Sequence, residues 1–61
     1  MERVLLTVEE AAEALRVGRS LAYSFVASGL LRSVKLGRLR RVPVSAIEEF
    51  ISRQLQEQQY G

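Results

Sequence analysis

The strongest constraint on the fold is a break between two short helical patterns at residues 16–18 (RVG). Before this break, apolar residues recur at i, i+3, i+4 and i+7, which is one face of an amphipathic helix. These positions are Val8, Ala11, Ala12 and Leu15. Thr7 and Glu10 have the spacing of a capping box, so a helix is predicted over residues 8–15. Gly18 readily adopts the positive φ that ends a helix, and it therefore predicts a sharp turn.

A second helix is predicted over residues 19–28, where Ala22, Phe25 and Val26 share one side. The other side is small and rich in hydroxyl groups. It consists of Ser20, Tyr23, Ser24 and Ala27. Gly29 is expected to end this helix, and the leucines that follow it are expected to return the chain to the core.

Between residues 33 and 42 the pattern changes to the alternation that is typical of β-strands, which predicts a β-hairpin turning at Gly37 and Arg38. Pro43 should close the second strand because it cannot donate to the ladder. Two strand registers are possible, and they differ in which side chains lie on each face of the hairpin. A two-residue loop pairs Leu36 with Leu39 and Val34 with Arg41. A three-residue loop pairs Val34 with Val42, which groups apolar residues, and is the register we predict.

Ser45 and Glu48 have the spacing of a second capping box, so a third helix is predicted over residues 46–57. Its apolar stripe is Ile47, Phe50, Ile51 and Leu55. Phe50 is the expected centre of the core. The predicted fold is thus mainly α with a small β-hairpin, in a single domain over residues 1–61.

The composition argues against several classes of function. The chain has no Cys and no His, so disulfides and the usual zinc clusters cannot form. It also has no Asp, and a Ser-His or Cys-His nucleophile pair is impossible. We expect no enzyme activity, no metal, no cofactor and no small-molecule substrate. No apolar run approaches the roughly 18 to 20 residues that a membrane-spanning helix needs, and we expect a cytoplasmic protein without a membrane partner.

Charge is strongly segregated along the chain. Residues 14–47 contain seven of the nine basic residues and no acidic residue, and all seven glutamates lie outside this stretch. A formal net charge of +2 therefore conceals a local charge of +7. Such a stretch creates a positive field that attracts a polyanion.

The predicted order is helix, tight turn, helix, hairpin, helix, with the basic residues starting at the turn and continuing through the hairpin. Two helices joined by a short turn containing Gly form a helix-turn-helix, whose second helix enters a DNA major groove. The hairpin is then a wing. The candidate DNA-binding residues are Arg16, Arg19, Ser20, Tyr23, Ser24, Lys35, Arg38, Arg40 and Arg41.

Several of these residues have alternative roles. Arg19 can form a bidentate contact with guanine, or it can contact a phosphate from the helix start. Tyr23 can pack its ring on the domain or offer its hydroxyl to a phosphate. Arg38 at the hairpin tip can be a solvated turn residue, although its basic neighbours favour a phosphate or minor-groove contact. Arg41 can instead pair with a glutamate of the third helix.

Several segments also carry a family resemblance. They are residues 6–12 (LTVEEAA), 15–17 (LRV), 19–20 (RS), Tyr23, 28–29 (SG), 34–38 (VKLGR) and 40–43 (RRVP). Together they resemble the excisionase-type branch of MerR-like winged helix-turn-helix domains. The family commonly has Thr where Leu21 stands and a basic residue where Ser24 stands, so two donors of the second helix are absent here.

The resemblance implies a bacterial or phage DNA-binding protein that acts as a recombination directionality factor for an integrase, with several copies assembled along one DNA site. A single module contributes only about 600 to 1,000 Å² of buried surface on DNA, which favours self-association along the DNA. A transcriptional regulator with the same fold is the alternative. A protein-interaction module whose basic face binds an acidic partner is a further one.

Overall fold

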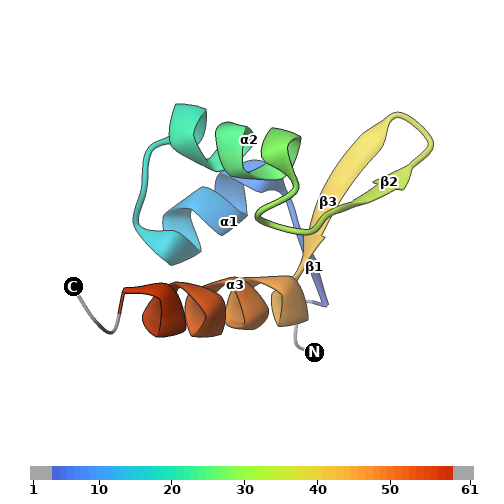
Figure 1. Ribbon diagram of the computed structural model, residues 1–61. Helices are drawn as coiled ribbons and strands as arrows, with labels where there is room; N and C mark the ends of the chain where they lie inside the picture. The colour runs from blue at the N-terminus through green and yellow to red at the C-terminus, as the bar shows by residue number, and fades with distance from the viewer. Residues whose placement is uncertain (1–3, 59–61) are drawn as a thin grey trace.

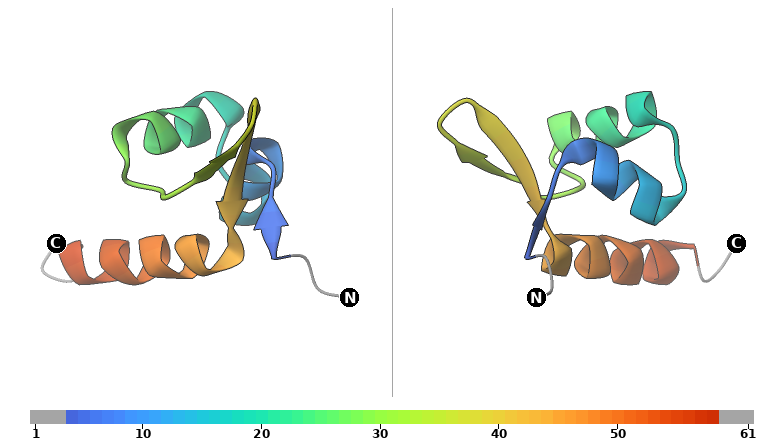
Figure 2. Two further views of the ribbon diagram at one scale, coloured as in Figure 1. Left: turned by 90° about the vertical axis from the view of Figure 1, so that its right-hand side faces the viewer. Right: turned by 180° about the vertical axis from the view of Figure 1, so that it is seen from behind.

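The computed structural model describes residues 4–58 of the chain. Three helices and three short strands follow one another as β1 (Leu5–Leu6), α1 (Val8–Leu15), α2 (Arg19–Ser28), β2 (Val34–Leu36), β3 (Leu39–Pro43) and α3 (Val44–Glu57). Helices α1 and α2 lie on one side of α3, and the β2–β3 hairpin projects away from the helices (Figure 1). This is a winged helix-turn-helix, as the sequence predicted. The right view of Figure 2 shows the same projection of the hairpin from behind.

The first helix begins and ends with side-chain and backbone caps. The Thr7 backbone N–H donates to Glu10 Oε1 and the Glu10 N–H donates to Thr7 Oγ1, both at 3.0 Å. The predicted capping box is therefore confirmed. At the other end, the Arg16 N–H donates to the Glu13 carbonyl and the Val17 N–H to the Ala12 carbonyl, at 3.1 and 3.0 Å, which is the hydrogen-bond pattern of a Schellman motif.

The prediction that Gly18 takes the positive φ between the helices is wrong. Arg16 is the left-handed residue, with φ 61° and ψ 41°, because the Schellman motif places this conformation directly after the last helical residue. Gly18 has φ −71° and ψ 159°, an extended conformation, and is the N-cap of α2. The turn is as sharp as predicted, but an arginine makes it.

The second helix has the predicted bounds and the predicted faces. Ala22 is buried, and Phe25 and Val26 are half-buried against the core. Gly29 ends the helix with φ 84°, as expected. Of the two leucines that follow, only Leu31 is buried, whereas Leu30 is 42% exposed.

The sheet contains one strand more than the predicted hairpin. Its order is β1-β3-β2, with both pairs antiparallel, and Leu6 of β1 is paired with Val42 of β3. This additional strand, β1, was not predicted from the sequence. A strand of two residues has too little alternation to be recognised from its pattern.

The predicted three-residue register of the hairpin is wrong. The observed pairs are Val34 with Arg41, Lys35 with Arg40 and Leu36 with Leu39, which leaves a two-residue loop. Gly37 has φ 64°, as the first central residue of a type II′ turn requires. The two-residue turn places Val34 opposite Arg41, so Val42 lies beyond the last β2–β3 pair.

The third helix begins at Val44, two residues before its predicted start. Pro43 is the N-cap, and no side chain caps this end. The Val44 N–H instead donates to the carbonyl of Val4, the residue before β1, at 3.0 Å. The predicted capping box of Ser45 and Glu48 is therefore wrong, because a neighbouring backbone group already satisfies a free amide at the helix start.

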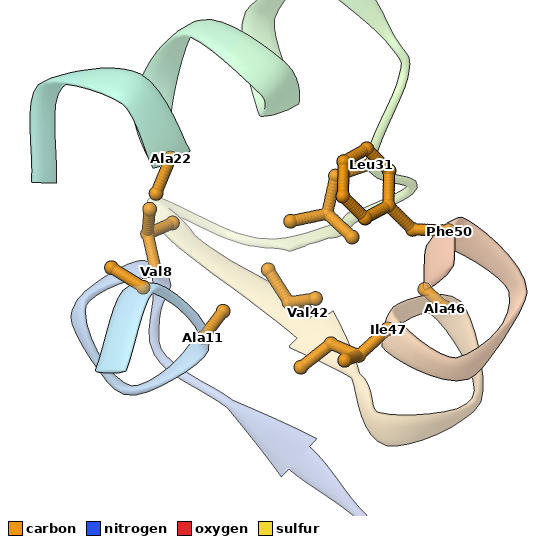
Figure 3. Close-up of a cluster of buried hydrophobic side chains, with 9 residues drawn as sticks. Val8, Ala11, Ala22, Leu31, Val42, Ala46, Ile47 and Phe50 are labelled. Carbon is orange, nitrogen blue, oxygen red and sulfur yellow. The ribbon is translucent and has the colours of Figure 1, made fainter. Parts of the chain in front are cut away.

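The core lies where α1, α2, β3 and α3 meet (Figure 3). Leu31 and Val42 are fully buried, and the Phe25 and Phe50 rings lie 5.0 Å apart at an interplanar angle of 43°. The prediction of Phe50 as a core residue is confirmed. The rest of the predicted stripe of α3 is only partly correct, because Ile47 is buried whereas Ile51 and Leu55 are 44% and 68% exposed. Within residues 4–58 no helix has the length and apolar character needed to cross a membrane.

The two capping boxes expected from the sequence provide a test of the fold. Thr7→Ala removes an observed cap and should lower the free energy of unfolding by about 1 kcal/mol. Ser45→Ala removes no cap and should change it by less than about 0.5 kcal/mol. Urea denaturation followed by circular dichroism measures both values. A loss for Ser45→Ala as large as that for Thr7→Ala would contradict the observed start of α3.

Candidate nucleic-acid interface

The outer face of α2 presents the residues that the sequence predicted for contact with DNA. Arg19, Ser20, Tyr23 and Ser24 are all exposed, and the Arg19 side chain retains 72% of its accessible surface. The opposite face of α2 packs into the core through Ala22. Since residues 16–18 join α1 directly to α2, α2 occupies the position of the recognition helix in a helix-turn-helix.

Tyr23 is held by a residue of the first helix. Its hydroxyl donates a 2.9 Å hydrogen bond to Glu9 Oε2, across 14 residues of sequence. A phenolic hydroxyl has one proton to donate, and phosphate oxygens only accept. Tyr23 must therefore break its bond to Glu9 before it can donate to a DNA phosphate.

Glu9 is also close to cationic side chains. Its Oε2 lies 4.0 Å from Arg19 Nη1, and both side chains are largely exposed. The hydrogen bond from Tyr23 is the main cause that lowers the pKa of Glu9, with smaller contributions from its own backbone and from the charges of Arg19 and Arg41. The same hydrogen bond raises the pKa of the Tyr23 hydroxyl. An exposed ion pair of this length contributes little stability, so the arrangement mainly orients the Tyr23 and Arg19 side chains.

The wing gathers four of the predicted residues in the short hairpin. Lys35 and Arg40 are paired directly across β2 and β3, Arg38 lies in the exposed turn, and Arg41 is paired with Val34. Like charges directly opposite each other destabilise a sheet. A polyanion bound to this face would relieve that repulsion.

Hydrogen bonds within the wing hold two of these arginines in place. Arg40 Nη1 donates to Ser33 Oγ at 3.3 Å, and Arg41 Nη1 donates to the Arg40 carbonyl at 3.0 Å. Both bonds are exposed and use only part of each guanidinium, which has five N–H donors. The remaining donors can bind phosphate oxygens.

Two other arginines of the basic stretch differ in their surroundings. Arg16 is exposed at the end of α1, next to the turn that leads into α2. Arg32 Nε lies 3.2 Å from Glu49 Oε1, which connects the segment after α2 to α3. Both side chains of this ion pair are largely exposed. Glu49 is one of the third-helix glutamates that could have paired with Arg41, and it contacts Arg32 instead.

The fold therefore places all nine candidate residues on α2, on the turn before it and on the wing. Glu9 is the residue that sequence reasoning missed, because a glutamate in the first turn of a helix is expected for its favourable interaction with the helix dipole. No spacing along the chain signals its contact with Tyr23. Among residues 4–58 there is no group of three or more His, Cys, Asp or Glu side chains that could hold a metal ion.

The contact between Glu9 and Tyr23 can be tested by titration. Tyr23→Phe removes the hydrogen bond, so the pKa of Glu9 should rise toward its ordinary value. A lowered pKa in the folded state stabilises the protein above the unfolded pKa, and this contribution is lost as the pH falls through the folded pKa. The stability of Tyr23→Phe should therefore decrease less on acidification than that of the wild-type protein.

NMR titration of the Glu9 side-chain carboxyl carbon measures the pKa directly. Ser24→Ala is the matched control, because Ser24 lies on the same exposed face of α2. An unchanged pKa of Glu9 in Tyr23→Phe would contradict the observed hydrogen bond.

Sequence comparisons agree with this geometry. A probable excisionase of Saccharopolyspora erythraea is 54% identical over 56 residues, which are 92% of this chain and 57% of that protein. An excisionase of Streptomyces ambofaciens is 45% identical over 53 residues, which are 87% of this chain and 86% of that protein. The chain thus spans little more than half the length of the first relative. No solved structure matches it.

The model of a family described as a helix-turn-helix domain matches residues 5–55. The matched segment contains α1, α2, the whole wing and most of α3. It also contains every candidate DNA-binding residue. The chain therefore belongs to the helix-turn-helix domain family, and its relatives include two proteins named as excisionases.

Proposed function

We propose that this chain is a DNA-binding excision factor of the MerR-like winged helix-turn-helix type, which binds attachment-site DNA and directs an integrase toward excision. The observation that carries the proposal is the paired cationic wing beside an exposed recognition helix, in a chain whose relatives are named excisionases. Lys35 and Arg40 face each other without an acidic residue anywhere in residues 14–47. This arrangement suits a polyanion better than it suits the isolated fold.

The wing and helix α2 are proposed to make different contacts with DNA. The wing supplies phosphate contacts through Lys35, Arg38, Arg40 and Arg41, and these contacts position the protein without reading sequence. Helix α2 supplies a modest base readout, chiefly through Arg19, because serines can donate to or accept from several bases.

Several copies are expected to bind one DNA site. One module of this size buries about 600 to 1,000 Å² on DNA, and non-specific affinity driven by phosphate contacts is only about 10⁻⁴ to 10⁻⁶ M at physiological salt. Contacts between copies along the DNA would raise the total affinity. The location that this function requires is the cytoplasm of a bacterial cell.

Footprinting on the attachment DNA of the mobile element that carries the gene tests the proposed role. We expect protection of several adjacent segments within the attachment site, together with stimulation of integrase-mediated excision in a reconstituted reaction. Protection confined to a promoter, without an effect on excision, would indicate a transcriptional regulator instead.

The contribution of the wing can be measured through the salt dependence of binding. About five phosphate contacts predict that log K falls with log salt concentration at a slope near −4 to −5. The triple variant Arg38→Gln/Arg40→Gln/Arg41→Gln should reduce the magnitude of this slope by about 2 to 3, as each lost phosphate contact removes roughly 0.9.

Arg53→Gln on the exposed surface of α3 is the matched control and should leave the slope unchanged. Circular dichroism confirms that the triple variant is folded. If an acidic protein binds the basic face and duplex DNA fails to compete at low salt, the protein-interaction alternative is correct.

A further inference from the structure

We propose that the tip of the wing is an apolar wedge, formed by Leu36 and Leu39, that enters the minor groove of duplex DNA and contacts sugars and base edges there. The proposal rests on the DNA-binding function proposed above and adds a contact that none of the basic residues can make. It concerns the leucines that frame the turn at Gly37 and Arg38.

The register of the hairpin brings these leucines together. Leu36 and Leu39 are partners across β2 and β3, directly beside the two-residue turn. Alternation along each strand places Lys35 and Arg40, also partners, on the opposite face. Val34 lies two residues before Leu36, so it shares the leucine face and extends it toward the base of the wing. The wing therefore has one face that is apolar at its tip and carries Arg41 beside Val34 at its base, and one doubly cationic face.

The body of the protein does not cover the apolar face. Leu36 and Leu39 are 51% and 53% exposed, and Val34 is 39% exposed. None of these three belongs to the core or to the partly buried residues packed against it. The hairpin extends away from the helices, so the tip is its most remote part (Figure 1 and the right view of Figure 2).

The charges around the leucines indicate which partner covers them. Arg38 lies between them in the turn, and Lys35, Arg40 and Arg41 follow within three residues on either side. No acidic residue occurs in residues 14–47. An apolar partner of positive or neutral charge would gain little from this setting, whereas the minor groove has a negative potential that attracts inserted arginines.

The dimensions of the minor groove allow the tip of the hairpin to enter it. Neighbouring strands lie about 4.8 Å apart, and the minor groove is about 6 Å wide and 7.5 Å deep. The end of a two-residue turn can enter such a groove, whereas a ribbon lying flat with its side chains cannot. Leucine is among the apolar residues that minor-groove proteins insert as wedges between base steps. Arg38 would then contact the floor or a phosphate while the two leucines, which share one face, contact one wall of the groove.

Apolar and ionic contacts differ in their salt dependence, which separates the wedge from the phosphate contacts. We measure binding to a fluorescently labelled, A·T-rich duplex by anisotropy at several salt concentrations. Leu36→Ala/Leu39→Ala should bind about tenfold more weakly at every salt concentration, with the slope of log K against log salt unchanged because no counterion is involved. Arg38→Gln should instead reduce the magnitude of the slope by about 1.

Leu55→Ala is the control for loss of an exposed leucine, since Leu55 is 68% exposed on α3, outside the wing. It should bind DNA like the wild-type protein. A second measurement addresses the groove itself. Netropsin, a small molecule that fills the minor groove of A·T-rich DNA, should weaken wild-type binding by about tenfold and should hardly affect Leu36→Ala/Leu39→Ala.

Three outcomes would overturn the wedge. The first is wild-type affinity of a folded Leu36→Ala/Leu39→Ala variant. The second is loss of self-association by that variant in sedimentation without DNA, which would show that a second copy of the chain covers the leucines. The third is failure of the wild-type protein to bind any duplex at low salt, which would overturn the proposed function as well. The first two leave DNA binding by the protein intact.

Discussion

Strand β3 carries the interactions on which the rest of the structure depends. It pairs with β1 along one edge and with β2 along the other, and α1 and α3 both pack against it. Val42, near its end, is fully buried at the centre of the core (Figure 3). The same strand begins in the exposed wing, so one segment of five residues joins the packed interior to the candidate DNA-binding surface. The pairing of Val42 with Leu6 anchors the strand in the core, and the two-residue turn decides which wing residues face each other.

The distribution of charge follows from this arrangement. Arg32 is paired with Glu49, whereas the wing places two cations opposite each other with no acidic partner between them. On the other side, Glu9 reaches from α1 to the Tyr23 hydroxyl, which leaves the basic surface with one carboxylate at its edge. The surface is therefore not uniformly positive. It has a strongly cationic wing and a recognition helix whose donors are partly engaged.

Much of the fold was predictable because it depends on local chemistry. The capping box of Thr7, the faces of α2 and the end of that helix at Gly29 all rest on residues a few positions apart. The errors have different causes. At the start of α3, the Val4 carbonyl accepts a hydrogen bond from the free amide in place of a serine cap. In the hairpin, the grouping of apolar residues favoured a three-residue loop, whereas Gly37 and Arg38 form a two-residue turn. The left-handed conformation of Arg16 was also not predicted, because the intrinsic preference of glycine for a positive φ pointed to the nearby Gly18.

The sequence by itself determined the order of helices, turn and hairpin, and it showed that one continuous stretch of the chain is basic and free of acidic residues. Periodicity, capping and charge are properties of neighbouring residues, and they are visible without coordinates. Only the tertiary structure decided which residues share a face of the wing, which arginine forms an ion pair with α3, and that Glu9 contacts Tyr23. These contacts join residues that are far apart along the chain, or depend on a register that a shift of one residue would reverse, and the pattern of neighbouring residues does not select among the alternatives.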